Sequence, residues 1–247
     1  SNVDVSGTLS ITCTRPNGNP RFPATFWIGT SGANGTRKLL NGSDQLTYNL
    51  FTSGCATAWS GTTGVTVANS LTANGDANVT ITNIPFCLRI TGGQNTAKAL
   101  TFTTTETLTV RSTDSTGFSW GTGVLSLSGK VNALCLITTG NTLTFTYTSF
   151  QASDQTGSNG SFVVQCTNST TYSLALDSLS GVAIGITYTL GLQTLGNQSV
   201  NNVPGTGNTL TYQVPGKIFS GSSGQAGTCA SGSTCTGSDN RTVTVSY

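Results

Sequence analysis

The 247-residue sequence predicts an all-β protein built from two tandem antiparallel β-sandwiches. Three observations support this prediction: a composition poor in helix formers, short segments in which apolar and polar residues alternate, and an internal repeat. Charged residues make up 7% of the chain, against roughly a quarter in an ordinary soluble protein. With a single Glu and no Met, the chain lacks residues that favour helices and that pair charges along them.

The second half of the chain repeats the first in five blocks that occur in the same order. Residues 7–14 match 160–167 without a gap, and the later pairs are 25–30 with 172–177, 46–50 with 186–190, 84–85 with 214–215, and 107–110 with 242–245. Each block alternates apolar and polar residues, which is the period of a half-buried strand. About five such strands per unit, separated by Gly-, Asn- and Ser-rich turns, are typical of an antiparallel sandwich.

The polar, turn-rich stretch 112–117 suits a linker, so we place domain one at 1–115 and domain two at 116–247. Residues 116–159 precede the first repeated block in domain two, whereas only residues 1–6 precede it in domain one. The segments 124–127, 131–137 and 143–147 are interpreted as opening strands of domain two. We therefore expect that domain one lacks, or does not show, its own opening strands.

Seven cysteines in a chain without His predict disulfides and an oxidising compartment, because the CxxC and CxxH spacings of structural zinc are absent. Cys135 lies on an opening strand of domain two and Cys166 on the first repeated block, so we expect them to pair. The full expected set is Cys135–Cys166, Cys229–Cys235 and Cys55–Cys87. Cys13, the counterpart of Cys166, is left over. It pairs either with a cysteine preceding Ser1 or remains a buried free thiol.

The composition argues against catalysis and against nucleic-acid binding. Without His, the commonest general base, the serine triad and imidazole–metal sites are missing, and the eight carboxylates are scattered along the chain. The net charge is +2, and no basic cluster exceeds Arg37–Lys38, so neither nucleic acid nor an anionic membrane is expected as a partner. No apolar run approaches the length of a membrane span. We expect no enzyme activity, no cofactor and no metal.

Several motifs follow one another in a recognisable order. They are a strand ending in Cys13-Thr14, the Gly35-Thr-Arg37 turn, Leu46-Thr-Tyr48, Trp59, Ile84-Pro-Phe86 with Gly93-Gln94, and a final Thr/Val strand. This order resembles the spore-coat-protein-U domain used by subunits of archaic (Csu-type) chaperone–usher pili. Two such domains in one chain resemble the tip adhesin of such a pilus, whereas shaft pilins carry one. Domain two departs from the pattern because it lacks the Arg and carries the Cys229–Cys235 insertion.

The resemblance implies that domain two is an immunoglobulin-like sandwich without its last strand. A periplasmic chaperone would lend that strand during transit to the outer-membrane usher, and an adjacent pilin subunit would then replace it. The residues implied to line the acceptor groove are Val131, Ala133, Leu134, Leu136, Arg241, Val243, Val245 and Tyr247. The alternative is a closed domain with an ordinary last strand.

The resemblance also implies that domain one attaches the bacterium, at the pilus tip outside the cell, to abiotic or host surfaces through apolar loops, and so supports biofilm formation. The candidate contact residues are Phe22, Pro23, Val65, Val67, Ala68, Leu71 and Ala97. For Val65 and Val67 the alternative is packing inside the domain. Trp27 and Trp120 are expected in core and interdomain packing.

Two other functions fit the composition. A lectin-like adhesin would stack Trp27, Trp59 and Tyr48 on sugar rings. A structural shaft or coat subunit would need an N-terminal donor strand, for which residues 2–5 are short.

Overall fold

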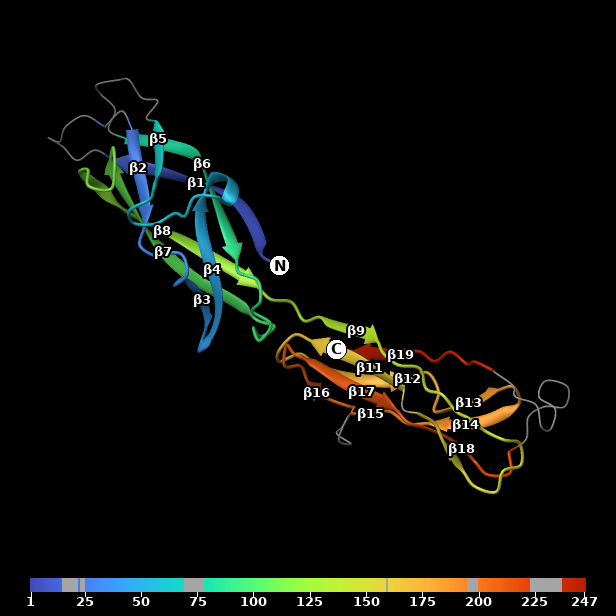
Figure 1. The fold of residues 1–247 in the computed structure, drawn as a ribbon. Helices are drawn as coiled ribbons and strands as arrows, with labels where there is room; N and C mark the ends of the chain where they lie inside the picture. The colour runs from blue at the N-terminus through green and yellow to red at the C-terminus, as the bar shows by residue number, and fades with distance from the viewer. Residues whose placement is uncertain (15–21, 23–24, 69–77, 159, 195–199, 223–236) are drawn as a thin grey trace. The chain divides into compact units, whose positions relative to one another are not determined.

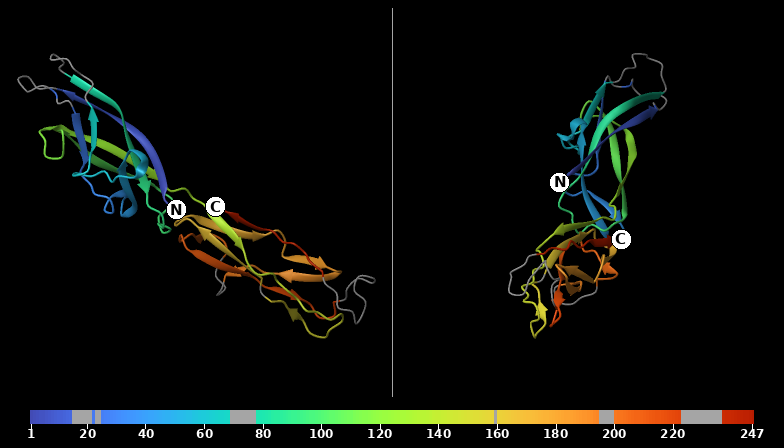
Figure 2. Two further views of the ribbon diagram at one scale, coloured as in Figure 1. Left: turned by 45° about the horizontal axis from the view of Figure 1, so that its top comes forward. Right: turned by 90° about the vertical axis from the view of Figure 1, so that its right-hand side faces the viewer.

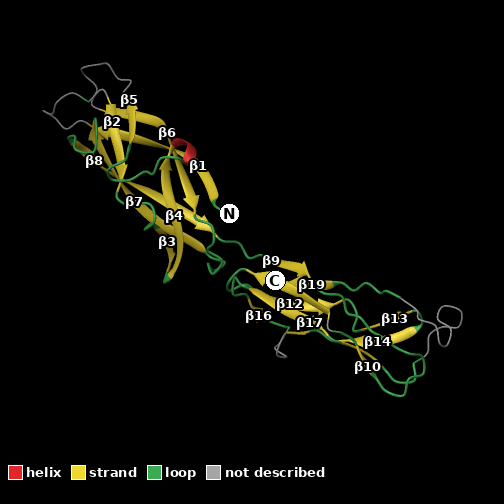
Figure 3. Ribbon diagram, in the orientation of Figure 1, coloured by secondary structure: helices red, strands yellow, loops and turns green. Residues whose placement is uncertain are grey.

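The computed structural model of the chain describes residues 1–14, 22, 25–68, 78–158, 160–194, 200–222 and 237–247. Its regular structure is almost entirely β (Figure 3), with one short 3-10 turn, Ser53–Cys55, among the described residues. All strand pairs within these ranges are antiparallel. The chain divides into two compact units, Ser1–Val131 and Asn132–Tyr247 (Figure 1). Within the described ranges, no helix has the length and apolarity needed to cross a membrane.

Unit 1 is a sheet of eight strands. Their order is β1-β6-β4-β3-β7-β2-β5, and β8 pairs with β7. The strands are β1 (Val3–Thr14), β2 (Thr25–Thr30), β3 (Lys38–Asn41), β4 (Asp44–Thr52), β5 (Val65–Ala68), β6 (Asn78–Ile90), β7 (Thr101–Ser112) and β8 (Ser119–Lys130).

The core of unit 1 follows from the alternation seen in the sequence. On β4, Leu46, Tyr48 and Leu50 are buried at every second position, as the pleat of a strand requires. They pack in one apolar cluster with Trp59, whose side chain is fully buried. The indole N–H of Trp59 donates to the Ile28 carbonyl at 2.8 Å, so the buried polar atom is satisfied.

Unit 1 has a distal end and a linker end, and each is marked by residues that lie opposite each other on paired strands. At the distal end, Thr14 lies opposite Asn78, and Ser112 lies opposite Phe26. At the linker end, Thr101 lies opposite Lys130, from which the chain passes to Val131. Figure 2 shows both ends in two further views.

Unit 2 consists of three small sheets, with strand orders β15-β17-β11-β9, β16-β12-β19 and β10-β18-β14-β13. The strands are β9 (Cys135–Thr139), β10 (Gln155–Thr156), β11 (Gly160–Cys166), β12 (Thr171–Leu176), β13 (Ser180–Ala183), β14 (Ile186–Leu190), β15 (Gln193–Thr194), β16 (Val203–Pro204), β17 (Thr209–Val214), β18 (Gly216–Ile218) and β19 (Val243–Ser246).

The core of unit 2 again follows the alternation. Phe162, Val164 and Cys166 of β11 are buried, and Phe162 stacks on Tyr212 at 5.5 Å between ring centroids. The hydroxyls of Tyr212 and Tyr172 share a hydrogen bond of 2.8 Å. This contact satisfies both buried hydroxyls.

The predicted domain boundary at 115/116 is corrected to Val131/Asn132. Residues 119–130, which include the supposed opening strand 124–127 of domain two, form β8 and pair with β7 along its length. The stretch 112–117 is a hairpin turn: the Ser112 N–H donates to the Phe118 carbonyl at 2.9 Å. Turn residues favour hairpins and linkers alike, so composition could not separate the two.

A second expected strand of unit 2 is also corrected. Residues 143–147 form no regular strand. Phe145 and Tyr147 instead pack against the small core around Ile186, Tyr188 and Ile218. The segment contributes apolar side chains to this small core but is not a strand of any sheet.

Two of the three predicted disulfides, Cys135–Cys166 and Cys55–Cys87, are confirmed. Cys135 and Cys166 lie directly opposite each other on β9 and β11, so their bond fastens these two strands together. The third predicted pair, Cys229–Cys235, lies outside the described residues.

Cys13 is a buried free thiol on β1. Its strand pairs with β6 as β11 pairs with β17, but no described strand lies on the other edge of β1, where β9 lies beside β11. Val3 and Val5 of β1 are more than half exposed. By the repeat, the free edge beside residues 9–13 of β1 corresponds to the edge of β11 on which the Cys-bearing strand β9 lies.

The repeat predicts that Cys13 is disulfide-bonded in the protein from its native source, as its counterpart Cys166 is to Cys135. Burial raises the pKa of the Cys13 thiol, which slows alkylation of the folded protein, so alkylation should follow denaturation. Peptide mass mapping without reductant, on protein purified from its native source, is expected to find the Cys13 peptide disulfide-linked. A fully alkylated Cys13 peptide would support the free-thiol alternative instead.

Candidate functional site

The first candidate site is an open strand edge in unit 2. Among the described residues, β19 pairs only with β12, and β9 pairs only with β11. The two strands run next to each other in Figures 1 and 2 without backbone pairing between them. An edge of unpaired N–H and C=O groups is a template for another strand.

In unit 1 the position that corresponds to this open edge is occupied by a strand. Residues 107–110 of β7 are the repeat counterpart of 242–245, and β7 carries β8 on its edge. In β8, Leu125 and Leu127 pack against the core of unit 1. Within the described ranges, unit 2 has no counterpart of β8.

Apolar side chains flank the open edge. Leu134, just before β9, and Leu136 on it are 50% and 56% exposed, and Ala133 is also exposed. Both leucines alternate with the buried Cys135, so they lie on the face away from the core. On β19, Val243 and Val245 are half-buried and pack against the unit 2 core, while Tyr247 is 58% exposed.

One of the predicted groove residues belongs elsewhere. Val131 packs against the core of unit 1, and its N–H donates to the Leu100 carbonyl at 3.0 Å. The sequence prediction failed here because the apolar run 131–137 continues across the boundary between the two units.

Arg241 is held within unit 2 and is not free to pair with an incoming strand. Its guanidinium forms an ion pair with Asp239 and donates to the Tyr188 hydroxyl at 3.1 Å. Tyr188 in turn donates to Asp239. Burial and the hydrogen bond to Asp239 raise the pKa of Tyr188.

A related cluster lies in unit 1, at the repeat counterparts of these residues. Arg37 donates to Glu106 at 2.9 Å, and the Tyr48 hydroxyl donates to the same Glu106 oxygen at 2.6 Å. Burial raises the pKa of Tyr48. By the repeat, Tyr48 corresponds to Tyr188 and Glu106 to Arg241, so unit 2 places its arginine where unit 1 has its carboxylate. Unit 2 lacks the Arg of the first motif, and its guanidinium comes from Arg241, just before β19.

The second candidate site is the distal end of unit 1, but it does not gather all of the predicted contact residues. Val65, Val67 and Phe22 are half-buried and pack against the apolar cores of unit 1. Ala68 is exposed. Pro23 and Leu71 lie outside the described residues.

Ala97 is separated from the other predicted contact residues. It lies in the segment between β6 and β7, at the linker end, and packs against the core. A polar hollow of about 420 Å³ at this end includes Ala97, Lys98 and Asp44 in its lining. Lys98 and Asp44 already form an ion pair of 2.9 Å.

The aromatic residues expected of a lectin are not available to a sugar. Trp59, Tyr48 and Trp27 are 0%, 1% and 5% exposed. Stacking on a sugar ring requires an open ring face, so these three residues serve the core. Trp27 is thus a core residue as expected. Trp120, expected between the domains, lies instead near the distal end of unit 1.

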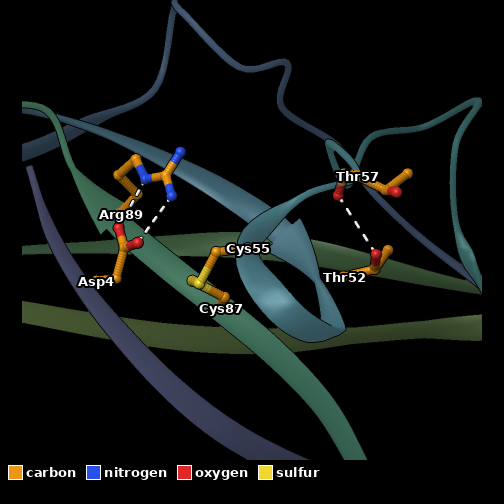
Figure 4. Close-up of a disulfide and its surroundings, with 6 residues drawn as sticks. All are labelled: Asp4, Thr52, Cys55, Thr57, Cys87 and Arg89. Atoms are coloured by element: carbon orange, nitrogen blue, oxygen red, sulfur yellow. Dashed lines mark hydrogen bonds and ion pairs between the residues drawn. A yellow bond between two sulfur atoms is a disulfide. The ribbon is translucent and has the colours of Figure 1, made fainter.

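Asp4, Cys55 and Cys87 form the only cluster of metal-ligating atoms in the described part of the chain (Figure 4). Both sulfur atoms are consumed in the disulfide, and Asp4 accepts from Arg89 at 2.6 and 2.7 Å. The Arg89 hydrogen bond lowers the pKa of Asp4. The cluster is therefore a structural contact between β1 and β6.

A solved structure shares this fold. The chain is similar to a structure described as the CsuC–CsuE chaperone–tip adhesion subunit pre-assembly complex from archaic chaperone-usher Csu pili of Acinetobacter baumannii, with a TM-score of 0.52, 15% identity, and coverage of 98% of this chain and 91% of that chain. A chaperone–tip adhesin complex of CFA/I fimbriae biogenesis matches with a TM-score of 0.37, 12% identity, and coverage of 97% and 90%. No curated protein matches the sequence.

A family model gives the closer assignment. The Spore Coat Protein U domain model matches residues 1–111 and 122–194, which fall in both units. The first match lies in unit 1, and the second runs from β8 through most of the strands of unit 2. The chain belongs to the Spore Coat Protein U domain family.

Proposed function

We propose that the protein is the tip subunit of an archaic chaperone–usher pilus, which attaches bacteria to surfaces and promotes biofilm formation. Unit 2 is an incomplete immunoglobulin-like sandwich that accepts a strand from a periplasmic chaperone and later from the adjacent pilin. The observation that carries this proposal is the open edge of β19, at the position that β8 fills beside β7.

The side chains around the open edge suit a donor strand of alternating pattern. A strand laid against β19 directs every second side chain toward the core of unit 2, where Val243 and Val245 already pack. On β9, Ile137 lies opposite the buried Val164, so it faces the core of unit 2, and such a strand would cover its 37% exposed side chain. Handover at the outer-membrane usher would then carry the protein from the periplasm to the cell surface.

The shaft-subunit alternative loses support from β1. A shaft subunit donates an N-terminal strand to its neighbour, and residues 2–5 were the candidate donor. Val3 lies opposite Ile90 and Val5 opposite Leu88, so this segment is already paired within unit 1.

The repeat allows a direct test with the chain's own sequence. A copy of residues 113–130, which form the β7–β8 turn and β8, is fused directly after Tyr247. Ser112 and Tyr247 occupy matching positions, so the fusion reproduces the unit 1 hairpin on β19. The fused chain is expected to be monomeric and to show a unit 2 melting transition at higher temperature, measured by size-exclusion chromatography and calorimetry, because the edge and apolar side chains are covered.

The matched control is the same fusion with Leu125→Asp and Leu127→Asp in the copied segment only. This variant keeps the added length but cannot place apolar side chains in unit 2, so it is expected to behave like the unmodified chain. A monomeric, reversibly folding unmodified chain that gains nothing from the fusion would contradict the proposal.

A further inference from the structure

The polar hollow at the linker end of unit 1 plays no part in the proposed function. It is lined on one side by Ser43–Gln45, at the turn between β3 and β4, and on the other by the segment between β6 and β7, which includes Gln94, Ala97 and Lys98. Its volume of about 420 Å³ lies within the range of roughly 300–1,000 Å³ that is usual for small-molecule sites. The hollow is therefore large enough for one small ligand.

The two walls of the hollow are fastened to each other within unit 1. The side-chain amide of Gln94 donates to the carbonyls of Thr47 at 2.9 Å and Thr91 at 2.7 Å, and its oxygen accepts from the Thr47 N–H at 2.5 Å. Each wall also turns at a glycine with positive φ, Gly42 at 58° and Gly93 at 79°, a conformation that favours glycine. A site whose walls are already in place loses less entropy when a ligand binds.

The charged groups of the hollow keep unused hydrogen-bonding capacity. Asp44 Oδ2 accepts from Lys98 Nζ at 2.9 Å, and the two side chains are 28% and 40% exposed. A lysine ammonium has three donors, and an ionised carboxylate accepts at both oxygens. Within the described residues, Asp44 Oδ1 and the two remaining donors of Lys98 have no partner. A ligand can reach both an acceptor and a donor here without breaking the ion pair.

This pairing of charges selects for a ligand that both donates and accepts. A simple anion or cation is attracted by one member of the pair and repelled by the other. Two neighbouring hydroxyls of a sugar have no such conflict, because one can donate to Asp44 while the next accepts from Lys98. Ala97 adds an apolar methyl group to the lining, which suits the C–H face of a sugar ring.

We infer that this hollow binds a neutral monosaccharide through two adjacent hydroxyls, with Asp44 as the acceptor and Lys98 as the donor. The sugar is held by hydrogen bonds, whereas the lectin site predicted from the sequence relied on stacking against rings that are buried in the core. The hollow lies in unit 1 and the open edge of β19 in unit 2, so this inference does not depend on the proposed function.

The test is saturation-transfer-difference NMR of the full-length chain with D-glucose, D-galactose and D-mannose, each titrated separately. At least one sugar is expected to bind, and Asp44→Ala and Lys98→Met are each expected to weaken it by about tenfold or more, because a hydrogen bond to a charged group is lost. Asp154→Ala is the matched control. It breaks an ion pair of similar exposure, with Lys217 in unit 2, and is expected to bind like the wild type.

The possible results divide clearly. Sugar binding by the wild type and by Asp154→Ala that Asp44→Ala and Lys98→Met both weaken supports the site. Absence of binding for all three sugars overturns it, as does binding that Asp44→Ala leaves unchanged or that Asp154→Ala reduces equally. The free amino acid glycine is a zwitterion that could also meet both charges, and binding of glycine without any sugar would overturn the assignment of the ligand. Denaturant unfolding followed by Trp fluorescence checks that the unit 1 variants are folded.

Discussion

Replacing Glu106 by alanine is expected to destabilise unit 1 by about 3–5 kcal/mol, because it leaves the Arg37 charge buried without its partner. The side chains of Arg37 and Glu106 are only 1% and 7% exposed. Glu106 also accepts hydrogen bonds from Tyr48, Ser31 and the backbone N–H of Gly32. Its loss therefore breaks a buried network that joins β7 to the segment between β2 and β3.

Tryptophan fluorescence can follow the unfolding of unit 1 selectively. All three tryptophans, Trp27, Trp59 and Trp120, lie in unit 1, so Trp fluorescence during denaturant unfolding follows that unit alone. Asp44→Ala is the matched control, since it breaks the exposed ion pair with Lys98 and is expected to cost less than about 1 kcal/mol. Equal unfolding midpoints for Glu106→Ala and Asp44→Ala would contradict the assigned role of the buried pair.

Trp59→Ala is expected to destabilise unit 1 by about 3–5 kcal/mol, because it empties a large, fully buried site in the core. The Ile28 carbonyl also loses the indole N–H that it accepts. The loss is measured as a lower denaturant midpoint, with Trp27 and Trp120 as the remaining fluorophores. Trp59→Phe keeps most of the volume and is expected to cost less.

This substitution also separates the adhesin from a lectin. A sugar-binding Trp59 would be replaceable without loss of stability, and only glycan binding would fall. A Trp59→Ala variant that unfolds at the wild-type denaturant concentration would therefore count against the core role that the structure gives this residue.

The sequence predicted the parts of the fold that depend on local alternation. The buried positions of β4 and β11 follow the period of two, and the same period revealed the repeat that aligns β7 with β19. The Cys135–Cys166 disulfide was also predicted, because alternation placed Cys135 on an opening strand of unit 2 and Cys166 lies in its first repeated block.

The features that the sequence did not predict depend on which strands pair with each other. The turn 112–117 has the composition of a linker, and only its hydrogen bonds identify it as the hairpin that returns β8 to β7. That misassignment moved Phe118 and Trp120 out of domain one, although both lie in unit 1. Ala97 was grouped with the distal loops because loop composition carries no information about which end of a sheet a loop occupies.

The pairing of β8 with β7 also sets the stoichiometry of assembly. Of the two matching strands β7 and β19, only β19 has its edge free. Under the proposed function, a chaperone and a neighbouring subunit must therefore compete for one place and exclude each other. Handover is then a replacement, and complexes with this chain should contain one such partner at a time.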